Sequence, residues 1–292
     1  MSTFGNILVS TLVQGSLYAI LGAGIVVLFR STGVVSFAQG AFVVVGAYVF
    51  YYLNARVGVP FYAALLLALL SMFVIGSLIY LLMFRRLTGA ETFVLVIATL
   101  GLNVVIQTVV ILSAGVNLIT PPEVLSLATL GVWHGLGIAP YQIFTIVAAG
   151  TLLIVLQLIL SRKRLGSQMR SVADNTLLAA LMKVHVHRMS ALAWGIAATC
   201  AGLAGVCLSL QTPLDPIGLQ DIGLVVLAGV MLGGIDSVTG ALAGGLLLAL
   251  VQQLSITWFG GQWSDPVSYL VLLGVLLVRP QGLYGSKGIV RL

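Results

Sequence analysis

Long apolar runs alternate with short polar stretches along almost the whole chain. A helix needs about 20 apolar residues to cross the hydrocarbon core of a bilayer. The pattern therefore predicts an all-α integral membrane protein, a polytopic bundle of about eight to nine transmembrane segments forming one domain over residues 1–292. The runs lie at about 7–29, 33–54, 60–83, 92–116, 140–161, 189–211, 222–235, 237–258 and 265–278.

Composition points to the same class. Hydrophobic residues make up 60% of the chain and charged residues only 7%, whereas a soluble domain carries about 25% charged residues. A soluble fold of this size would need a more polar surface, so the lipid bilayer is the expected solvent. The net charge of +6 does not indicate nucleic-acid binding, because the basic residues lie in short loops between apolar runs.

The basic residues gather in alternate loops. Of the 13, 11 lie in three places: Arg85 with Arg86, the stretch 162–188, and the chain end 279–291. Loops rich in Lys and Arg stay on the cytoplasmic side of a membrane. We therefore expect the long basic loop and the C-terminus in the cytoplasm. In that arrangement Arg30 lies inside and Arg56 outside, which puts the N-terminus outside.

Two glycine-bounded polar octets interrupt the apolar pattern, at 33–40 and at 233–240. Paired interruptions of this kind in two halves of a chain are typical of transporters built from repeats, where broken or re-entrant helices line the substrate path. The sequence thus predicts two pseudo-symmetric halves, with two ordinary turns as the alternative. The candidate pathway residues are Ser36, Gln39, Gly40, Gly233, Gly234, Asp236, Ser237 and Thr239.

Two further polar residues, Asn103 and Gln107, fall within the run 92–116. They are four apart and so share one helix face. They could line the same path, or they could form hydrogen bonds that hold helices together.

The segment 164–188 is too polar to cross a membrane, yet it is patterned. Within the segment 170–183, an apolar stripe fits a short amphipathic helix that begins just before the stripe, with Asp174 and Asn175 as candidate caps. Such a helix could lie on the membrane surface or press into a partner protein. The stripe consists of Leu177, Leu178, Leu181 and Met182.

Four segments carry a family resemblance in chain order. They are GSLYAILGAGIVVLFRSTGVVSFAQGAFVVVGAY (15–48), the loop GSQMRSVADNTLLAALMKVHVHR with the helix after it, VVLAGVMLGGIDSVTGALAGGLL (225–247) and LVRPQGLYG (277–285). They resemble the branched-chain amino-acid permeases of ATP-binding-cassette (ABC) importers, the Liv type. The resemblance covers nearly the whole chain.

The resemblance implies a multi-pass subunit of the bacterial inner membrane. It also implies four kinds of partner: a second homologous permease, two ATP-binding subunits that hold ATP and Mg²⁺, a periplasmic solute-binding protein and the lipid bilayer. The basic loop would then dock on an ATPase subunit. Met169 and the apolar stripe would supply apolar contacts. The charged residues Arg170, Asp174 and Lys183 would fix how the helix is aligned on the ATPase subunit.

Other function classes find less support in the sequence. The chain lacks the G-x-x-x-x-G-K-[ST] motif that cradles ATP phosphates, so we expect no cofactor on this chain. His185 and His187 are about 200° apart on a helix, which disfavours a metal site. An ion-coupled secondary transporter remains the alternative, but Asp221 and Asp236 lie at the ends of apolar runs rather than within them. Branched-chain amino acids are the expected solutes, and related amino acids or amides are further candidates.

Overall fold

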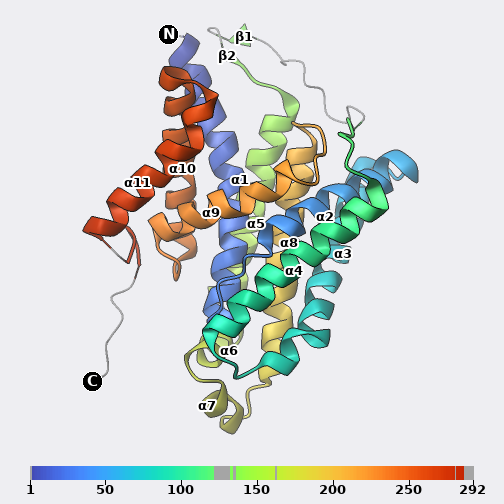
Figure 1. The fold of residues 1–292 in the computed structure, drawn as a ribbon, viewed down its shortest axis with the longest axis vertical. Helices are drawn as coiled ribbons and strands as arrows, with labels where there is room; N and C mark the ends of the chain where they lie inside the picture. The colour runs from blue at the N-terminus through green and yellow to red at the C-terminus, as the bar shows by residue number, and fades with distance from the viewer. Residues whose placement is uncertain (1, 122–131, 134–135, 162, 280, 286–292) are drawn as a thin grey trace.

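The computed structural model describes residues 2–121, 132–133, 136–161, 163–279 and 281–285. Within these residues the chain is helical, apart from connecting segments and a short hairpin in which β1 (Val132–Trp133) pairs with β2 (Leu136–Gly137). The predicted all-α class is confirmed (Figure 1). The helices are α1 (Ser2–Thr32), α2 (Gln39–Tyr51), η1 (Tyr52–Arg56), α3 (Phe61–Leu82), η2 (Phe84–Leu87), α4 (Thr92–Ala114), α5 (Pro140–Ser161), α6 (Lys163–Asp174), α7 (Thr176–Leu181), α8 (Val186–Ser209), α9 (Gly218–Gly233), α10 (Val238–Phe259), η3 (Gly261–Trp263) and α11 (Ser264–Val278).

Seven helices of the described residues are long and apolar enough to span a membrane: α1, α3, α4, α5, α8, α10 and Gly261–Val278 around α11. The helices α9, with 16 residues, and α2, with 13, are apolar but shorter. Together these nine account for the nine runs in the sequence. The prediction of about eight to nine segments therefore agrees with the structure.

The central helices are α1 and α8. In each, 78% of the most apolar window is buried within the chain, compared with 6% in Gly261–Val278 and 17% in α4 and α5. The outer helices therefore present apolar side chains such as Leu112 and Leu270 outward. In a membrane protein such surface faces lipid or a partner subunit.

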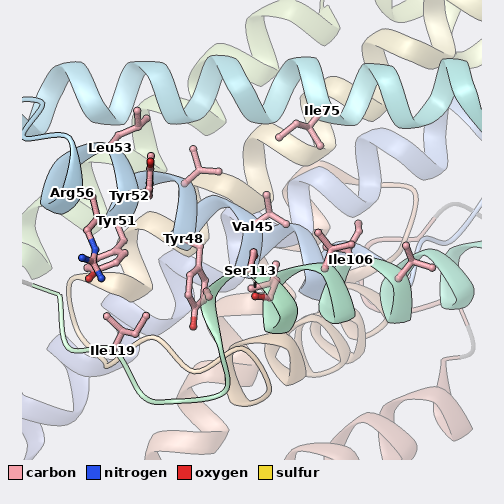
Figure 2. Close-up of a pocket in the computed structure, with 15 residues that line it drawn as sticks. Val45, Tyr48, Tyr51, Tyr52, Leu53, Arg56, Ile75, Ile106, Ser113 and Ile119 are labelled. Atoms are coloured by element: carbon pink, nitrogen blue, oxygen red, sulfur yellow. Dashed lines mark hydrogen bonds between the residues drawn. The ribbon is translucent and has the colours of Figure 1, made fainter.

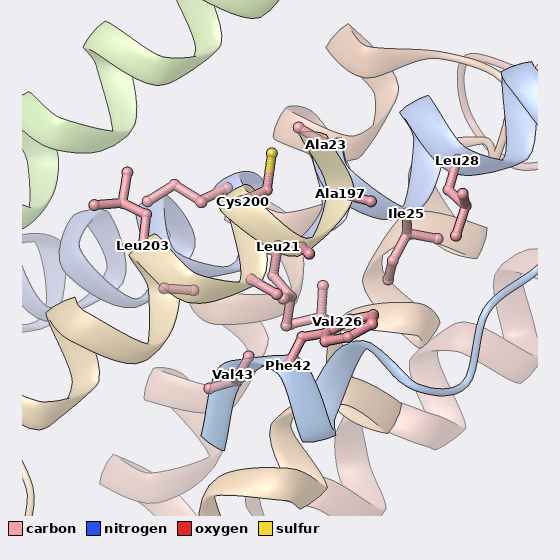
Figure 3. Packing of buried hydrophobic residues seen from close by; sticks show 14 of the residues in the cluster. Leu21, Ala23, Ile25, Leu28, Phe42, Val43, Ala197, Cys200, Leu203 and Val226 are labelled. Carbon is pink, nitrogen blue, oxygen red and sulfur yellow. The ribbon is translucent and has the colours of Figure 1, made fainter. Parts of the chain in front are cut away.

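Small residues let the central helices approach closely. A Cβ at Gly24 of α1 would lie 2.9 Å from Cβ of Cys200 on α8, and one at Gly202 would lie 2.6 Å from the Met72 side chain on α3. Figure 3 shows Cys200 and Ala197 within this buried cluster, which also includes Phe42 and Val226. Packing of small residues replaces the hydrophobic driving force that lipid removes.

Helices α1 and α8 run in opposite directions. Figure 1 shows α1 descending to the end where α6 and α7 lie, whereas α8 rises from that end. A non-helical segment follows each of them, 33–38 after α1 and 210–217 after α8, and each segment leads into a short helix, α2 or α9. Of the two predicted interruptions, 33–40 thus includes a non-helical segment before α2, and the pseudo-symmetry of the two halves stays a prediction.

Candidate translocation and coupling sites

The segment between α1 and α2 lies inside the bundle, and side chains hold its backbone. The N–H of Phe37 donates to Oγ1 of Thr99 on α4 at 3.2 Å, and the N–H of Ala38 donates to Oγ of Ser36 at 3.3 Å. Ser36 and Thr99 are both buried. Helix α2 therefore begins at Gln39, not at Gly33 where the apolar run begins.

Thr99 was missed by the sequence interpretation. It is fully buried on α4, four residues before Asn103 and eight before Gln107. This i, i+4, i+8 spacing places all three on one face of α4. This spacing from Asn103 and Gln107 is the sequence pattern from which Thr99 could have been predicted.

The first turn of α2 lies against the first turns of α9. A Cβ at Gly40 would collide with the carbonyl oxygen of Gln220, and a Cβ at Gly223 would lie 2.6 Å from the backbone nitrogen of Gly40. Glycine is needed at both positions because the two backbones meet there. This α2–α9 crossing, formed by Gly40, Gln220 and Gly223, was not foreseen from the sequence.

The second octet forms a tight turn between α9 and α10, as the alternative interpretation expected. The N–H of Ser237 donates to the carbonyl of Gly234 at 3.2 Å, and Oγ of Ser237 caps α10 by accepting from the N–H of Gly240 at 3.0 Å. Ser237 also forms a 2.9 Å hydrogen bond with the hydroxyl of Thr239. A Cβ at Gly233 would collide with the carbonyl of Gly240, so the two helix ends pack backbone to backbone.

Asp236 lines a small cavity beside this turn. The cavity has a volume of about 340 Å³ and includes Phe29 of α1, Leu276 of α11 and Gln281. Arg30 lies close enough to Asp236 and to Arg170 of α6 to interact with both electrostatically. Asp236 of the candidate pathway and Arg170 of the candidate docking loop therefore both lie near the end of α1.

A larger cleft lies between α3 and α4, over the outer part of α2 (Figure 2). Its volume is about 940 Å³, and its walls are mainly aliphatic, including Val45, Ile75 and Ile106. The hydroxyl of Tyr48 in this wall has no hydrogen-bond partner among the described residues. Arg56 lies at one end of the cleft. The sequence interpretation did not foresee this cleft.

The two loops at the far end of the bundle from α7 are joined. Ile119 and Leu214 exchange backbone hydrogen bonds of 3.1 and 2.8 Å as an antiparallel bridge. Leu214 is fully buried. The loops 117–121 and 212–217 therefore form one surface at this end.

A polar chain near the same end connects three helices. Gln14 of α1 donates to the hydroxyl of Tyr18, which donates to Oε1 of Gln252 on α10. Nε2 of Gln252 donates in turn to Asp265 at the start of α11, at 3.1 Å. Asp265 thus has a structural partner and joins α11 to the bundle.

The loop predicted to couple to an ATPase contains two helices rather than one. The chain breaks at Asn175, which has an extended backbone, and Oδ1 of Asn175 accepts from the N–H of Leu178 at 3.0 Å. Asn175 is therefore the N-cap of α7, and a separate helix, α6, precedes it. The position of the cap was predicted correctly.

The apolar stripe of this loop is exposed, whereas Met169 is not. Met169 is only 3% exposed and packs into the core, so it is not part of an exposed docking surface. Arg170 and Lys183 are exposed, and Asp174 ends α6. We define the α7 surface by its four most exposed apolar side chains: Leu177, Leu178, Leu181 and Met182, at 70%, 58%, 72% and 79% exposed.

Helix α6 connects the α7 surface to the bundle. Val172 is buried against the core, and a Cβ at Gly33, just after α1, would lie 3.9 Å from the carbonyl oxygen of Ala173. Gly33 has a φ of +70°, which glycine tolerates best. Helix α6 therefore lies next to the end of α1, where the segment 33–38 begins.

Comparison with known proteins identifies the family. A sequence model described as the branched-chain amino acid transport system / permease component matches residues 7–278. The chain belongs to this family. The resemblance carried by the four sequence segments is thus confirmed.

Relatives align with the permease over nearly their full length. It is 30% identical to the high-affinity branched-chain amino acid transport system permease protein BraD of Pseudomonas aeruginosa, over 95% of this chain and 94% of BraD. It is 26% identical to LivH of Escherichia coli, over 93% and 92% of the two chains. It is also 26% identical to a probable LivH of Methanocaldococcus jannaschii, over 96% and 92%.

A solved structure shares the fold. PsaBC from Streptococcus pneumoniae, in complex with Fab, superposes with a TM-score of 0.50 at 12% identity, over 94% of this chain and 92% of the other. At this identity the likeness concerns the fold alone. The family and the seven spanning helices together show that the protein is a multi-pass membrane permease.

Proposed function

We propose that the permease is the membrane-spanning subunit of an ATP-driven importer for branched-chain or closely related small amino acids. The observation that carries this proposal is the family match over residues 7–278. The relatives BraD and LivH are named as permeases for branched-chain amino acids. In this proposal a periplasmic binding protein delivers the solute to the joined loops 117–121 and 212–217.

Energy enters through the α7 surface. The chain has no phosphate-binding motif of its own, so ATP and Mg²⁺ bind to two partner subunits that dock on α7. The exposed leucines fit such a contact, because a cluster of large apolar side chains is costly to leave in water. The contact positions of α6 and Gly33 then carry the movement to the segment 33–38 and to α2.

The solute passes between this permease and a second homologous permease. The side chains proposed to line the path are Ser36, Gln39, Asn103, Gln107, Asp236, Ser237 and Thr239. Basic side chains at the α6–α7 end, such as Arg170 and Lys183, support placing that end in the cytoplasm. On this arrangement the C-terminus is cytoplasmic, and the membrane is the bacterial inner membrane.

The ion-coupled carrier is the weaker proposal. Ion coupling requires ionisable groups within the membrane. Asp236 lies in the turn before α10 and Asp265 lies at the start of α11, and both positions are helix boundaries. The relatives BraD and LivH, which are branched-chain amino acid transport permeases, do not favour this class either.

Uptake by a complete reconstituted complex tests the proposal. Proteoliposomes would contain the permease, its partner permease and both ATPase subunits, with binding protein added outside. We expect uptake of a radiolabelled branched-chain amino acid only when ATP is inside the vesicles and binding protein is present. Uptake at the same rate without either component would contradict the proposal.

A further inference from the structure

Three amide side chains near the start of α2 have polar atoms without hydrogen-bond partners among the described residues. These atoms are Nε2 and Oε1 of Gln39, Oδ1 of Asn103 and Oε1 of Gln220. Gln39 is only 1% exposed. Buried polar atoms normally have partners, and leaving them unpaired within a membrane is costly.

The helices that carry these amides meet at one place. The start of α2 contacts Gln220 and Gly223 of α9 through Gly40. The segment just before it is bonded to Thr99 on α4, one helical turn from Asn103. Gln39 and Gln220 therefore lie at the α2–α9 crossing, and Asn103 lies one turn of α4 from the residue that holds the segment before it.

We infer that these amides form the selective point of the pathway and recognise the zwitterionic end of an α-amino acid. The three free acceptor oxygens match the three N–H groups of an α-ammonium, and Nε2 of Gln39 can donate to the α-carboxylate. The inference rests on the proposed import of amino acids and specifies which groups of the solute the permease recognises. Neutral amides suit a solute that carries no net charge.

Charged residues near the crossing do not compete with the amides for the ammonium and carboxylate of the solute. Asp221 follows Gln220, but its side chain is exposed and interacts electrostatically with Tyr269 of α11. Arg30 and Asp236 lie together at the other end of the segment 33–38, beside α6. The selective point is therefore lined by dipoles rather than by ions, and an extra charge on the solute would lose solvation there without gaining a partner.

Solute protection of an introduced thiol tests the inference directly. In a background of Cys200→Ala and Cys207→Ala, Gln220→Cys would be labelled with a methanethiosulfonate reagent in vesicles that hold the complete complex and ATP. We expect leucine to slow labelling severalfold and 4-methylpentanoate, which lacks the ammonium, to leave it unchanged. Equal protection by both compounds, or no labelling during turnover, would overturn the inference.

Two controls separate local protection from global movement. Gln262→Cys, in the exposed turn η3, should be labelled at the same rate with or without leucine. Gln39→Leu should lower uptake at least tenfold, whereas the matched Gln157→Leu on the exposed face of α5 should not. Equal slowing at positions 220 and 262, or normal uptake by Gln39→Leu, would also overturn it. If the wild-type complex shows no ATP-dependent uptake, the proposed function fails instead, whatever the labelling shows.

Discussion

The hydroxyl of Thr99 accepts a hydrogen bond from the backbone N–H of Phe37, which lies 62 positions earlier in the chain. This bond fixes the buried segment before α2 to the middle of α4. Thr99→Val keeps the shape but leaves the N–H unpaired, which costs about 1–3 kcal/mol. We expect a lower midpoint of thermal unfolding in detergent and slower uptake. Thr99→Ser, which keeps the hydroxyl, should restore both, and equal loss in both variants would contradict the role of the bond.

The α2–α9 crossing predicts a sharp dependence on Gly40. Gly40→Ala places a methyl group against the backbone of Gln220 and should separate the helices, at a cost of about 1–3 kcal/mol for overpacking. Gly40→Leu should block uptake more than it lowers the amount of protein in the membrane. Gly101→Ala on α4 is the control, because open space surrounds that position. Similar uptake by the Gly40 and Gly101 variants would show that transport does not depend on the close backbone contact between α2 and α9.

The α7 surface predicts a loss of coupling without a loss of folding. Leu178→Asp combined with Lys183→Glu should prevent ATPase docking, because both side chains are exposed and contribute to no buried contact. Membrane insertion should stay normal while uptake is lost and ATP hydrolysis no longer responds to solute. Arg56→Glu, an exposed charge reversal at the other end of the bundle, serves as the control. Normal uptake by the double variant would show that α7 is not the docking element.

The cap of α7 gives a finer test of the same surface. Asn175→Ala removes the acceptor for the N–H of Leu178 and should cost the short helix about 1 kcal/mol. We expect weaker binding of the ATPase subunits, measured by co-purification at increasing salt. Asn175→Asp keeps an acceptor and should bind like the wild type. If the alanine variant binds equally well, the cap does not contribute to docking.

Much of the fold was predictable because lipid imposes simple rules. Each spanning helix must supply about 20 apolar residues, so the nine runs and the nine corresponding helices agree. The cytoplasmic placement of the loop that carries Arg170 and Lys183 rests on charge alone and stays a prediction. Asn175 was recognised as a cap because its amide favours the position before a helix.

The errors arose where tertiary contacts override local pattern. The segment 33–38 is apolar enough for a helix, yet its backbone is held by Thr99 from another part of the chain. Met169 was grouped with the apolar stripe in the sequence, but it lies on α6 rather than α7 and is buried in the core. The octet 233–240 resembles 33–40 in composition, but it forms a tight turn between α9 and α10. Neither composition nor spacing reports such long-range contacts.

The dependence of transport on its energy source tests the central claim most directly. The claim is that this permease is a passive gate, moved through α7 by a separate ATPase. Purified permease alone would be reconstituted into vesicles, and accumulation of a branched-chain amino acid would be measured under an inward proton or sodium gradient. We predict no accumulation until the partner subunits, binding protein and ATP are added. Concentrative uptake by the permease alone, driven by either gradient, would contradict the claim.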